Sequence, residues 1–198
     1  MGSLDARRAD LLIALARIWG LRRVMSHQPY RRLLGPAGRI RAWQELGANI
    51  DDNVTLGPWV WIRNPEKVRI GSGSRLSGRI FIDAWNQVTI GSNVLIGDHV
   101  DLLTGGHDVD DPRFKGKGGP ITIGDHAWLP RRVIVLPGVS IGDRAVVGTG
   151  SVVTRSVPDN GIAVGNPARV VRTRAQVDYE YVPSRFVFKR PRRRPAAR

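Results

Sequence analysis

The chain has 198 residues and a net charge of +14, and it contains no cysteine. This length allows one domain with a real core and small appendages, whereas the lack of cysteine excludes a disulfide framework and a thiolate metal site. The longest early apolar run, residues 11–16, is too short to span a membrane and lacks the layout of a signal peptide, so we expect a cytoplasmic protein.

The positive charge is concentrated at the two ends of the chain. Residues 1–42 carry a net +7 and residues 169–198 a net +8, whereas residues 43–168 carry −1. A neutral centre argues against a domain that reads nucleic acid in a groove, so we expect no specific nucleic-acid partner. The basic ends fit peripheral contact with an anionic membrane, at its inner face, or with an anionic glycan, and they fit a role in solubility equally well.

Residues 1–45 are predicted to form an N-terminal helical extension. Ser3 is a suitable helix cap, and Asp5 lies in the first turn that would follow it. Apolar residues follow at helical spacing, and arginines fill the other faces. Such a helix can lie on an anionic membrane, but an apolar stripe of this kind more often packs on its own domain or on a partner subunit. The apolar positions are Leu4, Leu11, Leu12, Leu15, Ile18 and Trp19.

Residues 46–172 contain an internal repeat of six residues. Aliphatic residues recur at this period, often with glycine directly after them and a small or β-branched residue four positions on. This period fits neither a helix nor a simple alternating strand, but it fits a coil with three short straight sides per turn of 18 residues. We expect one aliphatic residue per side to point inward, small residues and glycines to occupy the corners, and about five turns in all. The aliphatic positions are Ile50, Leu56, Ile62, Ile70, Leu76, Ile82, Ile90, Ile96, Leu102, Ile123, Leu129, Val135, Ile141, Val147 and Val153.

The repeat is interrupted by two-residue insertions at 63–69 and 83–89 and by a long loop at 103–122. Long loops in compact domains are usually functional, and this one holds His107 near its start. Glycines at 105 and 106 allow a close approach, and the acids at 108, 110 and 111 are candidates to orient the imidazole or bind substrate. Neutral imidazole suits the task of removing a proton from an attacking hydroxyl.

Two of the other histidines and the C-terminal tail are interpreted as lacking a catalytic role. His99 and His126 each follow an aliphatic residue by three positions, which places them at solvated corners of the coil. Residues 173–198 form a basic C-terminal tail, and we expect its last part, 188–198, to be disordered because it has almost nothing apolar to bury.

The pattern aliphatic-Gly-x-x-small-x over residues 123–172 resembles the hexapeptide-repeat acyltransferases, and most closely the maltose, galactoside and colanic-acid-type O-acetyltransferases. The resemblance covers roughly residues 48–172. It implies a mainly β fold, a left-handed parallel β-helix, to which the helical extension and the basic tail are appended. It also implies acetyl-CoA as co-substrate, no metal, and a homotrimer with active sites between subunits.

The resemblance also assigns site residues. The motif LLTGGHD matches the family's catalytic histidine at His107, and an acid in the preceding turn corresponds to Asp83, which would bind acceptor hydroxyls, hold His107 or simply cap a turn. Trp128 matches a tryptophan beside the active site. The backbone N–H of Arg131 matches the group that polarises the thioester, and Thr149, 18 residues later, matches a second contact to pantetheine. Thr154, Arg155, Arg169 and Arg172 match positions near the nucleotide end of coenzyme A.

This chain departs from the family pattern near the expected donor site. Pro130, Arg131 and Arg132 stand where small residues are usual, and Thr149 replaces a usual alanine. The bulky groups would narrow the thioester channel or alter the choice of acyl group or acceptor.

We therefore expect an acetyl-CoA-dependent O-acetyltransferase that modifies a sugar hydroxyl on a cell-surface glycan, a nucleotide sugar or a glycosylated metabolite. An N-acetyltransferase acting on an amino sugar and a non-catalytic scaffold with basic binding tails are the alternatives. A zinc enzyme like the γ-class carbonic anhydrases is disfavoured because histidines 27, 99, 107 and 126 lack the required spacing. A nucleotidyltransferase is disfavoured because the residues before the coil are too few for a nucleotide-binding domain.

Overall fold

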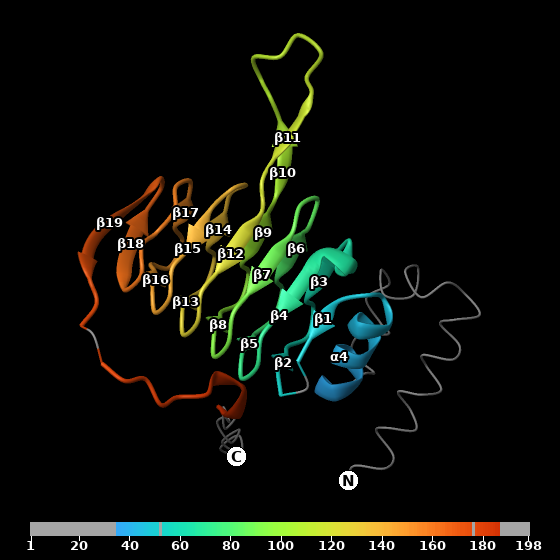
Figure 1. Ribbon diagram of the computed structural model, residues 1–198, viewed down its shortest axis with the longest axis vertical. Helices are drawn as coiled ribbons and strands as arrows, with labels where there is room; N and C mark the ends of the chain where they lie inside the picture. Colours follow the sequence, from blue (N-terminus) through green and yellow to red (C-terminus); the bar gives the residue numbers. More distant parts are fainter. Residues whose placement is uncertain (1–34, 52, 176, 187–198) are drawn as a thin grey trace, which may run out of the picture.

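The computed structural model describes residues 35–51, 53–175 and 177–186 (Figure 1). Within the region predicted as an N-terminal helical extension, helix α4 (Pro36–Glu45) is described and packs beside the first strands. The apolar stripe from Leu4 to Trp19 and the basic stretch 188–198 lie outside the described residues. None of the helices in the described ranges has the length and apolar character needed to cross a bilayer.

The chain winds into a solenoid of short parallel strands that stack into three sheets, here called faces A, B and C. Face A contains β1 (Asn49–Ile50), β4 (Val68–Ile70), β7 (Val88–Ile90), β12 (Ile121–Ile123) and β15 (Ser140–Ile141). Face B contains β2 (Thr55–Leu56), β5 (Arg75–Leu76), β8 (Leu95–Ile96), β13 (Trp128–Leu129), β16 (Val146–Val147) and β18 (Gly161–Gly165), with β19 (Ala168–Thr173) antiparallel at its edge. Face C contains β3 (Trp61–Arg63), β6 (Phe81–Asp83), β9 (Asp101–Leu103), β14 (Ile134–Val135) and β17 (Val152–Val153).

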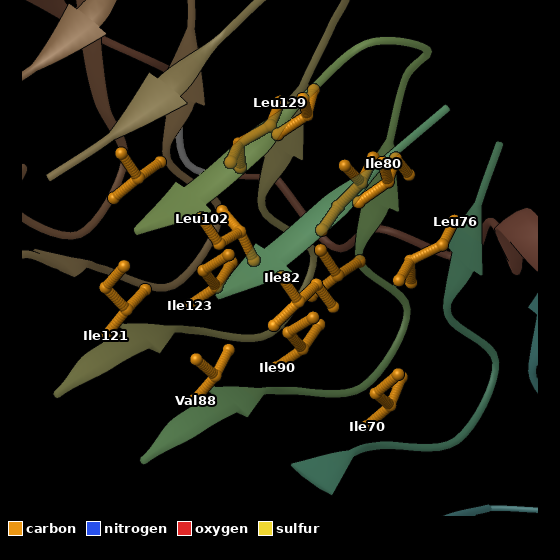
Figure 2. Packing of buried hydrophobic residues seen from close by; sticks show 14 of the residues in the cluster. Ile70, Leu76, Ile80, Ile82, Val88, Ile90, Leu102, Ile121, Ile123 and Leu129 are labelled. Atoms are coloured by element: carbon orange, nitrogen blue, oxygen red, sulfur yellow. The ribbon is translucent and has the colours of Figure 1, made fainter. Parts of the chain in front are cut away.

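The predicted inward rows are confirmed, since none of the fifteen aliphatic residues of the repeat is more than 4% exposed. Figure 2 shows several of them, including Leu76, Ile90 and Leu129, converging in the interior of the coil. The expectation of one inward residue per side was wrong. The small residues assigned to corners are also buried, because side chains two positions apart on a strand point to the same face. These second inward residues include Ala127, Val133, Val139, Ala145 and Ser151.

At most corners the chain turns at the third residue after the inward aliphatic residue. At these places the backbone enters the left-handed region, for instance with φ of 60° at His99 and 59° at Arg132. His126 is also a corner residue, with φ of 55°, as its spacing indicated. However, its side chain is partly buried and packs edge-on against Tyr181 at 5.4 Å between ring centroids, so it is not simply solvated.

The two insertions and the long loop leave the coil at one corner, between faces C and A. The register pairs Arg63 with Asp83 and Asp83 with Leu103, so the three interruptions begin at stacked positions in successive turns. The first contains the short 3₁₀ helix η1 (Pro65–Lys67) and the second a tight turn at residues 84–87. This corner, the C–A corner, is therefore where the regular coil admits additional structure.

Residues 177–186 fold back along the coil as a strap, which the sequence did not indicate. The Tyr181 hydroxyl donates to the carbonyl of His126 at 3.1 Å, and the Ser184 N–H donates to the carbonyl of Gly73 at 3.0 Å. The Phe186 carbonyl accepts from Arg75 at 2.8 Å, just beyond the short helix η2 (Pro183–Arg185). In Figure 1 the strap runs from the last turn, in orange, toward β5 and β2.

Replacing Leu76 by alanine is expected to lower the free energy of unfolding by about 2–5 kcal/mol, because its fully buried side chain fills the coil interior and little can collapse into the space. Denaturant unfolding followed by circular dichroism measures this. Thr122→Ala, which changes an exposed outward residue of β12, is the matched control and should shift stability by less than about 0.5 kcal/mol. Equal effects of the two changes would contradict the inward assignment.

Candidate active site

The long loop at the C–A corner contains a β-hairpin that projects beyond the coil (Figure 1). It is formed by β10 (Gly105–His107) and β11 (Gly116–Gly118), with Gly105 opposite Gly118 and His107 opposite Gly116. The hairpin follows β9 directly and returns to the coil at β12. His107 is thus held by a paired strand and not by an irregular loop.

The imidazole of His107 is fixed by Phe114, across the hairpin. The two rings stack with centroids 4.3 Å apart and planes 6° from parallel. His107 Nδ1 lies 2.8 Å from the carbonyl oxygen of Phe114. A carbonyl only accepts hydrogen bonds, so the neutral ring carries its proton on Nδ1, which leaves the lone pair of Nε2 available as a base.

The acidic residues of the loop stabilise its tip and do not contact the imidazole. Asp108 pairs with Lys117 at 3.2 Å and accepts from the N–H of Asp110. These hydrogen bonds lower the pKa of Asp108, the backbone bond being the larger cause. Asp111 accepts from the N–H of Arg113 at 2.8 Å. The hydrogen bond that orients the imidazole is accepted instead by the Phe114 carbonyl, and substrate binding by these acids stays a prediction.

The base of the hairpin is locked to the preceding turn by Thr104. Its fully buried hydroxyl accepts from the N–H of Asn86 and donates to the carbonyl of Asp83, each at 2.8 Å. The Asn86 side chain returns a hydrogen bond to the Thr104 carbonyl at 2.8 Å. Residues 83–86 and the start of the hairpin thus form one rigid unit.

Glycine is required at the two facing positions where the hairpin begins. A Cβ on Gly105 would lie 2.8 Å from the indole of Trp85, and a Cβ on Gly118 would lie 2.7 Å from the Asn86 amide nitrogen. The predicted close approach is therefore real at Gly105. At Gly106 the nearest atom to such a Cβ would be at an ordinary 3.8 Å, so that glycine is not required for space.

Asp83 and His107 line the same cleft. The Asp83 side chain is 15% exposed, and its Oδ1 lies 3.2 Å from the Arg63 guanidinium without an aligned hydrogen bond. Among the described residues no hydrogen bond joins Asp83 to His107. The cleft has a volume of about 610 Å³, within the range of small-molecule sites. We call it the His107 cleft. It is lined by Arg63, Asp83, Trp85, Asn86, His107, Lys117 and glycines 105, 106, 116 and 118.

The residues matched to the donor lie elsewhere on the chain. Arg131 and Thr149 are exposed at the corner between faces B and C, at the opposite edge of face C from His107. In the described part of the chain, their backbone N–H groups donate to no protein acceptor. The Arg131 carbonyl accepts from Gly150, and its side chain lies 3.8 Å from Asp98. Trp128 is an exposed outward residue of face B.

The residues matched to the nucleotide end form two groups. Thr154 and Arg155 follow β17 and are exposed at the C–A corner, two turns beyond the hairpin. Arg169 and Arg172 are exposed on β19 at the end of face B. One chain therefore brings Asp83 and His107 together but leaves Arg131 and Thr149 across face C. Among the described residues no group of three His, Asp or Glu side chains is placed to hold a metal ion.

Comparison with known proteins agrees with this geometry. Residues 120–155 match the bacterial transferase hexapeptide model, six repeats. The galactoside O-acetyltransferase of Escherichia coli is 37% identical over 141 residues, which cover 70% of each chain. A hexapeptide-repeat acetyltransferase from Vibrio cholerae, solved with acetyl coenzyme A, superposes with a TM-score of 0.68 at 28% identity over 81% of this chain and 91% of the other.

A solved galactoside acetyltransferase in complex with coenzyme A is 34% identical, with a TM-score of 0.64 over 69% of this chain and 70% of the other. The stacked six-residue sides and the extent of these matches both indicate the same family. The chain belongs to the hexapeptide-repeat acetyltransferase family.

Proposed function

We propose that this protein transfers the acetyl group of acetyl-CoA to a hydroxyl group of a sugar, with His107 as the general base. The observation that carries the proposal is the Nδ1 hydrogen bond to Phe114, which in the neutral ring of this cleft-lining residue keeps the Nε2 lone pair free to accept a proton. The relatives support the donor and the acceptor class, since two solved structures hold acetyl coenzyme A or coenzyme A and one relative is named for galactosides.

The reaction proceeds by direct attack, without a covalent enzyme intermediate. Nε2 of His107 removes the hydroxyl proton as the sugar oxygen bonds to the thioester carbonyl carbon. Negative charge develops on the carbonyl oxygen, and the N–H of Arg131 is the donor proposed to stabilise it. The C–S bond then breaks, and the proton held by His107 passes to the departing sulfur, so the products are the acetylated sugar and the free thiol.

The residues matched to coenzyme A have suitable chemistry for it. The N–H groups of Arg131 and Thr149 are one turn apart and unpaired within the described chain, so they can bind the amides of a pantetheine arm lying along the coil. Trp128 offers an exposed apolar surface beside that path. Thr154, Arg155, Arg169 and Arg172 offer exposed hydroxyl and guanidinium groups for the phosphates at the nucleotide end.

The site is completed by a second copy of the chain in a homotrimer. His107 and Arg131 lie at opposite edges of face C, so a thioester cannot meet both in one chain. The outward row of face A is polar, with Arg69, Thr122 and Ser140 exposed. The outward row of face C is largely apolar and is formed by Trp61, Phe81, Ile134 and Val152, with Asp101 among them. Apolar rows of this kind mark surfaces that another chain covers.

Asp101, the acidic member of the outward row of face C, has a pKa shifted by its surroundings. Burial raises the pKa of Asp101, with an opposing effect from His99.

Contact of the basic chain ends with an anionic membrane or glycan stays a prediction, since most of those residues lie outside the described ranges.

Replacing His107 by alanine is expected to lower kcat about 10²–10⁴-fold, because the attacking hydroxyl loses its base. The assay supplies acetyl-CoA with a panel of sugars, nucleotide sugars and amino sugars, and records free thiol and acetylated product. His126→Asn is the matched control, since it removes an imidazole at another corner and keeps a residue suited to positive φ. Transfer by His107→Ala at the parent rate would exclude the proposed base.

The same assay separates the alternative functions. Acetylation of hydroxyls supports the proposal, whereas acetylation of amino sugars alone indicates N-transfer. Hydrolysis of acetyl-CoA with no acceptor modified, in an intact folded protein, would favour a scaffold with no transferase role.

Ile134→Asp is expected to convert the trimer into a monomer and to abolish transfer, because a charge would stand in the apolar outward row of face C. Light scattering after size exclusion gives the mass of each species. Thr122→Asp places the same charge on the polar face A and should leave a trimer. A parent protein that elutes as an active monomer would contradict the shared site.

A further inference from the structure

Trp85 is an exposed aromatic residue on an unusually rigid support. Its side chain is 58% exposed, so much of the indole is open to a ligand. The turn that carries it is fastened by the Thr104 hydrogen bonds to Asp83 and Asn86. In addition, Lys67 Nζ donates to the Trp85 carbonyl at 2.6 Å.

The indole is held in the His107 cleft by its neighbours. It lies over Gly105, where a Cβ would approach the ring to 2.8 Å, so the glycine two residues before His107 provides its seat. The Arg63 guanidinium carbon lies 6.0 Å from the ring centroid, and Arg63 is itself paired with Asp83. Trp85 therefore has a fixed place relative to both Asp83 and His107.

Trp85, Asp83 and His107 together offer the kinds of contact that a sugar ring needs. A flat, electron-rich ring packs against the C–H face of a pyranose, which is the apolar surface of a sugar. Asp83 lines the same cleft with its side chain 15% exposed, and its carboxylate can accept a hydrogen bond from a sugar hydroxyl there. A sugar held at Asp83 would present a neighbouring hydroxyl of the same ring toward His107, which lines the same cleft.

We propose that Trp85 is the acceptor platform, and that it makes the enzyme select cyclic over open-chain acceptors. This inference rests on the proposed function and makes it more specific, because it names a pyranose ring with at least two free hydroxyl groups as the substrate. An open-chain polyol has the same hydroxyl groups but no rigid C–H face. Trp85 is a specificity-determining residue here, since it contacts the substrate without taking part in proton transfer.

The test compares kcat/KM for a methyl pyranoside and for the open-chain alditol of the same sugar, with acetyl-CoA saturating. The parent is expected to prefer the pyranoside. Trp85→Ala should raise the pyranoside KM roughly tenfold and remove most of the preference, as expected for the loss of one aromatic stacking contact. Trp85→Phe should retain most of it. The KM for acetyl-CoA and the elution volume should not change in either variant.

Val109→Ala is the matched control, since Val109 is an exposed apolar residue at the tip of the same hairpin, outside the cleft lining. An unchanged pyranoside KM in Trp85→Ala would overturn the platform while leaving the transferase intact. Trp85→Ala could instead dissociate or unfold while Trp85→Phe shows no preference for the pyranoside over the alditol. That result would assign Trp85 a structural role and would also overturn the platform. If the parent modifies no sugar at all, the proposed function itself is wrong. This outcome can be told apart from the two above, because in those the parent still acetylates the pyranoside.

Discussion

The structure depends on the stacking of six-residue sides. Each strand is only two or three residues long along most of the coil, so no strand is stable except as part of a ladder with its neighbours above and below. The inward residues are buried only because successive turns cover each other. A segment can be added to such a coil only where it does not interrupt a ladder, which means at a corner. The stacked interruptions at the C–A corner follow from this constraint, and the candidate active site is built from them.

The rigidity of the site comes from the same stacking. Thr104 stands one turn above Asp83 and Asn86, so its hydroxyl can bond to both through backbone groups that the coil already fixes. The hairpin register then carries His107 opposite Gly116 and within reach of the Phe114 carbonyl. A long side chain is not needed to orient the imidazole, because the backbone carbonyl of Phe114, just before β11, does so. A base whose ring is held in this way has less rotational freedom to lose when the substrate arrives.

Much of the coil could be predicted from the sequence because period six is a local signal. The aliphatic residues from Ile50 to Val153, the corner positions of His99 and His126, and the loop with His107 were all readable from spacing. Contacts between distant segments were not readable. The Phe114 carbonyl, the indole beneath which Gly105 lies and the strap at 177–186 depend on which turns are neighbours in space. The roles given to Arg131, Thr149 and the distal arginines came from the family resemblance and not from spacing.

The strap has a consequence for how the coil comes apart. Linear arrays of repeats normally lose their end units first, because an end unit has only one neighbour. Here the chain leaves the last turn, where Arg174 bonds to Asn160 and Arg144, and returns to Gly73 and Thr55 near the opposite end. The terminal turn cannot peel away without releasing contacts to early turns. The two extremities of an open solenoid are thereby joined into a circuit, which favours all-or-none melting over gradual fraying.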